Sequence, residues 1–118
     1  MANATSYAYE DLRAYVTANW RFIELRDSLG NPFVRLSTSD TRVAWTHTAG
    51  SQTLELTITL QGSNSDITLP STFAQSALFK NSTDTNDKAL SIETFPAFTM
   101  EGIGDELTIK HRIEVPRV

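Results

Sequence analysis

The sequence contains no cysteine, only five glycines and four prolines, and no long apolar run. The absence of cysteine excludes disulfides, thiolate nucleophiles and zinc sites built on cysteine. The apolar runs fall far short of the ~20 residues that span a bilayer. Residues 1–6 have neither the basic region nor the apolar core of a signal peptide. We therefore expect no signal peptide and no membrane partner.

Basic residues are few and scattered. Ten Lys and Arg stand against fourteen Asp and Glu, which gives a formal net charge of -4 at pH 7. The densest basic group, residues 110–112, falls on a stretch whose side chains alternate between two faces. A nucleic-acid-binding protein needs a basic stripe that neutralises several phosphates. The charge pattern therefore argues against nucleic acid as a partner.

Motifs that carry catalysis or hold a cofactor are also missing. Gly102-Ile103-Gly104 lacks the third glycine and the strand-to-helix setting of a phosphate-binding loop. No G-x-S-x-G sequence occurs. The adjacent acidic pairs Glu10–Asp11 and Asp105–Glu106 do not face each other on a helix or a strand. We assign no catalytic, cofactor-binding or metal-binding residue, and we expect that the protein is not an enzyme.

Two stretches of strict alternation indicate the fold class. Residues 54–60 and 107–115 place apolar side chains at every second position and polar ones between them. Successive side chains of a strand point to opposite faces, so each stretch has one dry and one wet face. This pattern is typical of an antiparallel sheet that is packed on one side. With no repeat and no linker in 118 residues, we expect a single domain over residues 1–118.

The N-terminal segment predicts a helix over residues 7–18, capped by Thr5 or Ser6. An apolar stripe runs along this helix, formed by Ala8, Leu12, Tyr15 and Val16. We expect the stripe to dock against a sheet.

The remaining chain predicts a mainly β (α+β) domain, an antiparallel β-sandwich or open barrel of about 7–8 strands. The expected strands are 20–26, 33–36, 42–48, 53–61, 66–69, 90–95 and 107–115. Among them, 42–48, 53–61 and 66–69 predict a meander of three strands joined by tight turns.

Two segments of the second half are less regular. In residues 71–79 the spacing of Phe73, Ala74, Ala77 and Leu78 fits a short second helix. Pro96 interrupts the strand at 90–95, which predicts that this segment lies at an edge or a bend of its sheet.

His47 and His111 both fall on the apolar side of an alternating strand, beside Trp45 and Ile109 respectively. If the two strands are neighbours, the imidazoles could meet and form a switch that responds to pH near neutrality. Two histidines without a placed carboxylate make a poor metal site. The sequence favours buried or rim histidines that are hydrogen-bonded or face a partner subunit.

Aromatic residues suggest two kinds of contact surface. Trp20, Trp45 and the tyrosines could stack on a sugar or a peptide. Tyr7 and Tyr9 have no evident role in a core, and Tyr is enriched at protein interfaces. We therefore assign Tyr7 and Tyr9 to a candidate interface with another subunit.

Three segments carry a resemblance to a known group of proteins. They are Tyr9-Glu10-Asp11-Leu12-Arg13 through Trp20, Glu24-Leu25-Arg26-Asp27, and the closing stretch from Phe98-Thr99-Met100-Glu101 to Glu114-Val115-Pro116. In overall character, over most of the chain, the sequence resembles small structural or tail-associated proteins of tailed phages and prophages of Gram-positive bacteria. The resemblance implies a β-rich module that assembles into rings or tubes and has no catalytic residues.

Three hypotheses of function follow. The first is a non-enzymatic structural or assembly protein, a virion component that binds itself or other virion-type proteins in the host cytoplasm or in the virion. The alternative is a monomeric carbohydrate- or peptide-binding β module with a concave pocket. The third is a small enzyme, which needs a carboxylate within hydrogen-bond reach of His47 or His111.

Overall fold

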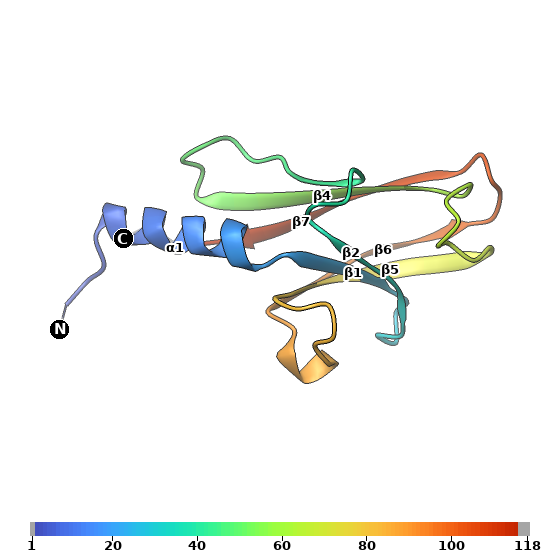
Figure 1. The fold of residues 1–118 in the computed structure, drawn as a ribbon, viewed down its shortest axis with the longest axis horizontal. Helices are drawn as coiled ribbons and strands as arrows, with labels where there is room; N and C mark the ends of the chain where they lie inside the picture. Colours follow the sequence, from blue (N-terminus) through green and yellow to red (C-terminus); the bar gives the residue numbers. More distant parts are fainter. Residues whose placement is uncertain (1, 116–118) are drawn as a thin grey trace.

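The computed structural model describes residues 2–115, which form one N-terminal helix, a short 3-10 helix and seven strands in two antiparallel sheets (Figure 1). Helix α1 spans Ser6–Asn19. The strands are β1 (Phe22–Arg26), β2 (Pro32–Ser37), β3 (Val43–Trp45), β4 (Thr53–Gln61), β5 (Ser71–Phe79), β6 (Ser91–Met100) and β7 (Glu106–Glu114), and the 3-10 helix η1 (Asn86–Lys88) lies between β5 and β6. One sheet has the strand order β2-β1-β5-β6 and the other β3-β4-β7. The mainly β sandwich with an N-terminal helix is confirmed.

The core lies between the inner faces of the two sheets. On β4, Leu54, Leu56, Ile58 and Leu60 are at most 1% exposed, and the residues between them are half-buried. Across the core, Ile23 and Leu78 of the other sheet are fully buried. The alternation in residues 54–60 therefore marks one dry face, as the sequence predicted.

Strand β4 pairs along its whole length with β7, and this pairing corrects the expected meander. Leu56 lies opposite His111, and Leu60 lies opposite Leu107. Residues 66–69 form no strand, so the predicted third strand of the meander is wrong. Alternation fixes which face of a strand is dry, but it does not say which strand, near or distant in sequence, lies beside it.

Residues 71–79 form strand β5, so the predicted second helix is wrong. Strand β5 lies between β1 and β6, and seven of its nine residues are buried. A strand covered on both faces loses the alternation of polar and apolar residues. The run from Phe73 to Leu78 therefore has the spacing of a buried helix as well as that of a doubly covered strand.

Strand β6 is the edge strand that Pro96 predicted. Phe73 of β5 lies opposite Phe98, and Gln75 lies opposite Thr94, so residues 95–97 bulge against the single residue Ala74. Proline cannot donate a hydrogen bond to a sheet, and edges and bulges tolerate it for that reason. The expectation of an edge or a bend is confirmed, because β6 is an edge strand and bulges at this point.

A charged cluster fixes the connection where the chain crosses from β2 to β3, between the two sheets. Arg42 pairs with Asp40 at 2.9 Å and with Asp66, in the loop after β4, at 2.8 Å. Hydrogen bonds from Arg42 lower the pKa of Asp40 to about 2. The cluster ties two loops together at one rim of the sandwich.

Helix α1 begins at the expected place, since the Thr5 side chain accepts a hydrogen bond from the amide of Ala8 at 3.2 Å. Its position differs from the prediction, because it extends beyond the sheets (Figure 1) instead of lying on one. Leu12 and Tyr15 of the apolar stripe are 50% and 48% exposed, while Val16 is buried. Only Trp20 and Arg21 separate α1 from β1, so the helix continues away from the sandwich.

Replacement of Leu56 by Ala tests the placement of the core. We expect a loss of about 2–5 kcal/mol in the free energy of unfolding, because the substitution leaves a cavity between two close-packed sheets. The measurement is urea denaturation at neutral pH. The control is Thr108→Ala on the exposed face of β7, which should change stability by less than about 0.5 kcal/mol. Equal effects of the two variants would contradict the placement of Leu56.

Candidate functional site

His111 lies inside the core and connects the two sheets. Its Nδ1 atom lies 2.6 Å from the Ser76 hydroxyl on β5, and its Nε2 atom lies 2.8 Å from the Ser91 hydroxyl on β6. A neutral imidazole donates from one nitrogen and accepts at the other, and a serine hydroxyl can do either. Both ring nitrogens are thus satisfied without a charge.

Burial lowers the pKa of His111 from 6.5 to about 4. The cause is the loss of water around the ring, which disfavours the charged form. His111 and Ser76 have no exposed surface, so a substrate cannot reach this serine and histidine. Their arrangement supports packing rather than nucleophilic catalysis.

His47 lies elsewhere in the molecule, just after β3. Its Nδ1 atom accepts a hydrogen bond from the amide of Glu55 at 3.2 Å, and its ring packs edge-on against Trp45 with centroids 5.8 Å apart. Strand β4 separates β3 from β7. The two histidines therefore do not form the pair that neighbouring strands would have allowed.

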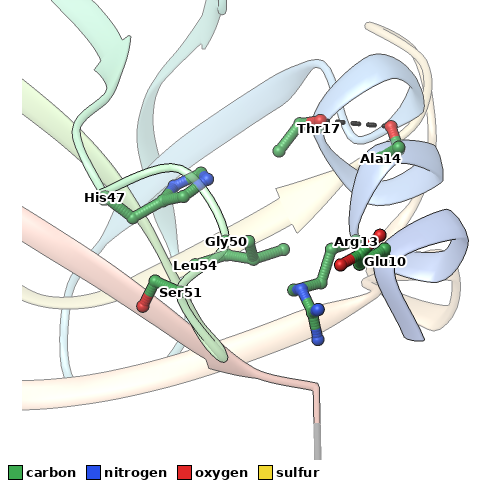
Figure 2. Close-up of a pocket in the computed structure, with 8 residues that line it drawn as sticks. All are labelled: Glu10, Arg13, Ala14, Thr17, His47, Gly50, Ser51 and Leu54. Carbon is green, nitrogen blue, oxygen red and sulfur yellow. Dashed lines mark hydrogen bonds between the residues drawn. The ribbon is translucent and has the colours of Figure 1, made fainter. Parts of the chain in front are cut away.

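A hollow of about 340 Å³ lies at the base of α1, between the helix and the turn that joins β3 to β4 (Figure 2). Its polar lining comes from both sides: Glu10, Arg13 and Thr17 of the helix, and His47 and Ser51 of the turn. Leu54, the first inward residue of β4, adds an apolar surface. Of the histidines that the sequence singled out, His47 is the one that borders open space.

Arg13 is the most unusual residue of this hollow. It is 7% exposed, and its Nη1 atom is buried and has no hydrogen-bond partner among residues 2–115. The contrast with other arginines is clear, since Arg26, Arg35 and Arg112 each pair with a carboxylate at 3.1 Å or less. A buried charged group without a partner costs stability, so this nitrogen calls for an explanation.

Arg13 is not among the residues that the sequence singled out. A signal was available, because Arg13 lies three residues before Val16 and seven before Trp20, which places all three on one side of a helix. The apolar stripe shares Val16 with this side, but its other members, Ala8, Leu12 and Tyr15, drew attention away from Arg13. That stripe lies mostly in solvent, and the side with Arg13 faces the sandwich.

A second charged cluster covers the outer face of the four-stranded sheet. Glu24 pairs with Arg26 at 2.6 Å and with Arg35 at 3.0 Å. The guanidinium of Arg35 stacks on the Phe79 ring at 3.8 Å and donates to the carbonyl of Ser82 at 3.1 Å. The charges of this cluster have partners within the chain, and they hold the loop after β5 against the sheet.

The predicted interface tyrosines differ in exposure. Tyr7 is 78% exposed and Tyr9 is half-buried. Tyr15, the tyrosine of the apolar stripe, accepts a hydrogen bond from the side-chain ammonium of Lys80 at 2.6 Å. Tyr7 is therefore the more accessible of the two candidates.

Within residues 2–115, no three or more His, Asp or Glu side chains gather closely enough to hold a metal ion. Neither helix of that range combines the length and the apolar character that a membrane crossing requires. No family model, no curated protein and no solved structure matches the sequence.

The buried ring of His111 predicts a loss of stability on acidification. Below pH 6.5 the unfolded chain binds a proton at this ring, whereas the folded protein does so only near pH 4. Unfolding is therefore favoured as the pH falls through this window, by roughly 3 kcal/mol in all. Urea denaturation at several pH values measures the slope, and His111→Gln should remove it.

The titration of His111 can be distinguished from that of the carboxyl groups in two ways. Hydrogen bonds from Arg42 lower the pKa values of Asp40 and Asp66. The stability that these two carboxylates give to the folded protein is therefore lost only below the usual pKa range of Asp. The ring proton signals of His111 in an NMR titration should report a neutral ring down to about pH 4. A midpoint near 6.5 would contradict the burial of the ring.

Glu24→Gln tests the cluster on the outer face. The variant leaves Arg26 and Arg35 without their carboxylate in a buried setting. We expect a loss of about 3–5 kcal/mol in the free energy of unfolding, as for other broken buried ion pairs. The matched variant Glu106→Gln, at an exposed position on β7, should have little effect. Similar denaturation midpoints for the two variants would show that the cluster is not buried.

Proposed function

We propose that this protein is a non-enzymatic structural or assembly protein, and that it joins a larger assembly through the exposed face of α1. The observation that carries the proposal is the apolar stripe of this helix, which lies in solvent. Leu12 and Tyr15 are about half exposed, and Tyr7 near the helix start is 78% exposed. The resemblance to tail-associated proteins of phages suggests a virion as the setting.

Helix physics supports a partner for this stripe. Isolated helices shorter than about 12–15 residues are marginal in water, and most helices in proteins owe their stability to packing. With 14 residues, α1 is near this limit and gains stability from packing. The sandwich contacts the side of Arg13 and Val16, the two buried residues of the helix. Burial of each large apolar side chain of the stripe would add roughly 1.5–3 kcal/mol.

Charge complementarity favours a second copy of this chain as the partner. Lys80 lies beside Tyr15, at the C-terminal end of the stripe, whereas Asp11 lies in its N-terminal half. Two α1 helices packed antiparallel around Leu12 would bring Lys80 of each copy toward Asp11 of the other. An interface of this kind is isologous and closes as a dimer, which can serve as the unit of a ring or tube.

The second candidate function, a ligand-binding β module, has one observation in its favour. Trp20 and Trp45 pack against the core, so they do not form the aromatic platform that the sequence suggested. The hollow beside α1 offers such a module a concave surface with several polar residues in its lining.

The molar mass in solution tests the first proposal. Light scattering after gel filtration, at low and high salt, should give an oligomer that resists salt, because apolar burial depends little on ionic strength. Leu12→Glu should reduce it to a monomer of 13.1 kDa. The control is Leu29→Glu in the turn after β1, which is 85% exposed and should leave the mass unchanged.

A wild-type monomer at high concentration would overturn self-association. If the chain assembles only after it is mixed with purified virion proteins, the partner of the α1 stripe is one of those proteins and not a second copy of the chain. Equal dissociation by the Leu12 and Leu29 variants would show that the loss reflects unfolding or charge rather than the stripe. Circular dichroism of both variants distinguishes unfolding from dissociation.

A further inference from the structure

We propose that the free edge of β7 pairs antiparallel with the β7 edge of a second copy of the chain, centred on Thr108, and that this contact joins dimers formed through α1 into a larger assembly. The joining of dimers rests on the function proposed above. The edge contact itself does not need α1, so either contact can fail without the other.

Strand β7 is the edge strand best able to accept another strand. Within residues 2–115 the two sheets end in β2, β3, β6 and β7, and natural sheets protect such edges by shortness, proline or a bulge. Strand β3 has only three residues. Strand β2 begins with Pro32 and β6 contains Pro96, and each has a register shift against its neighbour. Strand β7 spans nine residues without proline and keeps one register with β4.

The hydrogen bonds at both ends of the β4–β7 pair show which backbone groups of β7 face the edge. The amide of Gly62 donates to the carbonyl of Asp105 at 2.8 Å, and the amide of Val115 donates to the carbonyl of Gln52 at 3.1 Å. Residues that exchange hydrogen bonds alternate along an antiparallel pair, so the odd-numbered residues of β7 bond to β4. The amides and carbonyls of the even-numbered residues therefore point to the free edge.

Part of this edge is capped within the chain. The amide of Arg112 donates to the carboxylate of Glu93 on β6 at 3.4 Å, and a charged side chain at such a place hinders pairing with another strand. No hydrogen bond within residues 2–115 engages the outward amides of Glu106, Thr108 and Lys110, and all three residues are exposed. The open stretch therefore has Thr108 at its centre.

Charge complementarity selects the same centre. If Thr108 lies opposite Thr108 of the second copy, Lys110 of each copy lies opposite Glu106 of the other. Opposite charges across two strands stabilise the pair, whereas like charges destabilise it. A pairing centred on Lys110 would place Lys110 opposite Lys110 and Glu106 opposite Glu114. The charges therefore disfavour that register.

The register between these two places Glu106 opposite Arg112, which also joins opposite charges. It needs the Arg112 amide, however, and the Arg112 guanidinium already pairs with Glu55 at 3.1 Å. In the pairing centred on Thr108, the residue opposite Arg112 is Gly104, in the turn before β7. The paired stretch then ends where the capped part of the edge begins.

The inward side of this pairing is apolar. Leu107 of one copy lies opposite Ile109 of the other, and both side chains point toward the core of their own sandwich. Leu107 is buried, whereas Ile109 at the uncovered edge is half-buried. The contact would therefore cover more of Ile109 and extend the three-stranded sheet across two copies.

The small size of the edge contact determines its role. A few paired residues bury far less than the roughly 1,200 Å² of a stable interface, so single chains should pair weakly. A dimer held by α1 carries two such edges, and linked contacts strengthen one another. Both contacts have two-fold symmetry. A chain with two different two-fold contacts adds a further copy at each of them, which builds a ring or an open filament.

Light scattering at rising protein concentration tests the edge contact with Thr108→Pro. Proline removes the outward amide at the centre of the pairing, and the monomer should stay folded because this amide bonds to nothing within residues 2–115. We expect the wild-type mass to rise beyond that of a dimer and the mass of Thr108→Pro to stop at the dimer. A wild-type mass that stops at the dimer, or an equal rise in both proteins, would overturn the edge contact.

Exchange of the two charges provides matched controls. Lys110→Glu and Glu106→Lys each place like charges opposite each other, so each should raise the concentration needed for growth beyond the dimer roughly tenfold. The double variant, and an equal mixture of the two single variants, should restore growth. Residues 106 and 110 lie about 13 Å apart along one strand, so rescue reports a contact between copies. Failure of both rescues would overturn the register centred on Thr108.

Leu12→Glu distinguishes a failure of the edge from a failure of the helix contact. This variant lacks the α1 contact and should be a monomer in gel filtration. At the high concentrations of NMR its Lys110 amide should shift with concentration, and addition of Thr108→Pro should abolish the shift. No shift at Lys110 would overturn the edge contact whatever the wild-type mass. A shift in a wild-type protein that forms no α1 dimer would support the edge contact and overturn the helix contact alone.

Discussion

The close packing of the two inner sheet faces is the constraint on which the rest of this structure depends. Within this packing, His111 fixes the position of one sheet relative to the other. Apolar contacts hold the sheets together but tolerate small slides. The two hydrogen bonds of His111, to Ser76 and Ser91, have narrow limits of distance and angle. They tie β7 to β5 and β6 of the other sheet and so limit how the sheets can slide.

Much of the fold could be predicted from the sequence, because each of β4 and β7 has one covered face. Their alternation gave the correct strands and the correct inward side, including the inward placement of His111. Strand β5 could not be recognised, since both of its faces are covered and its composition then resembles a buried helix. The pairing of β4 with β7 joins segments distant in sequence, and no local pattern carries that information.

The candidate site was less predictable than the fold, for a related reason. A histidine on an apolar face is visible in the sequence, but its partners come from other elements. The ring of His111 is hydrogen-bonded to two serine hydroxyls, and the ring of His47 accepts a hydrogen bond from the backbone amide of Glu55. Arg13 was hidden by the usual assumption that the apolar stripe of a helix faces the protein. That assumption fails when the helix projects past the sheet, and only the tertiary structure shows this.

Both functional hypotheses arise from the position of α1. Only Trp20 and Arg21 lie between α1 and β1, and the helix projects past the end of the sandwich (Figure 1). Its apolar stripe then lies uncovered, which favours a partner subunit. Its other side faces the turn after β3 and the start of β4, and the hollow that Arg13 borders lies between them.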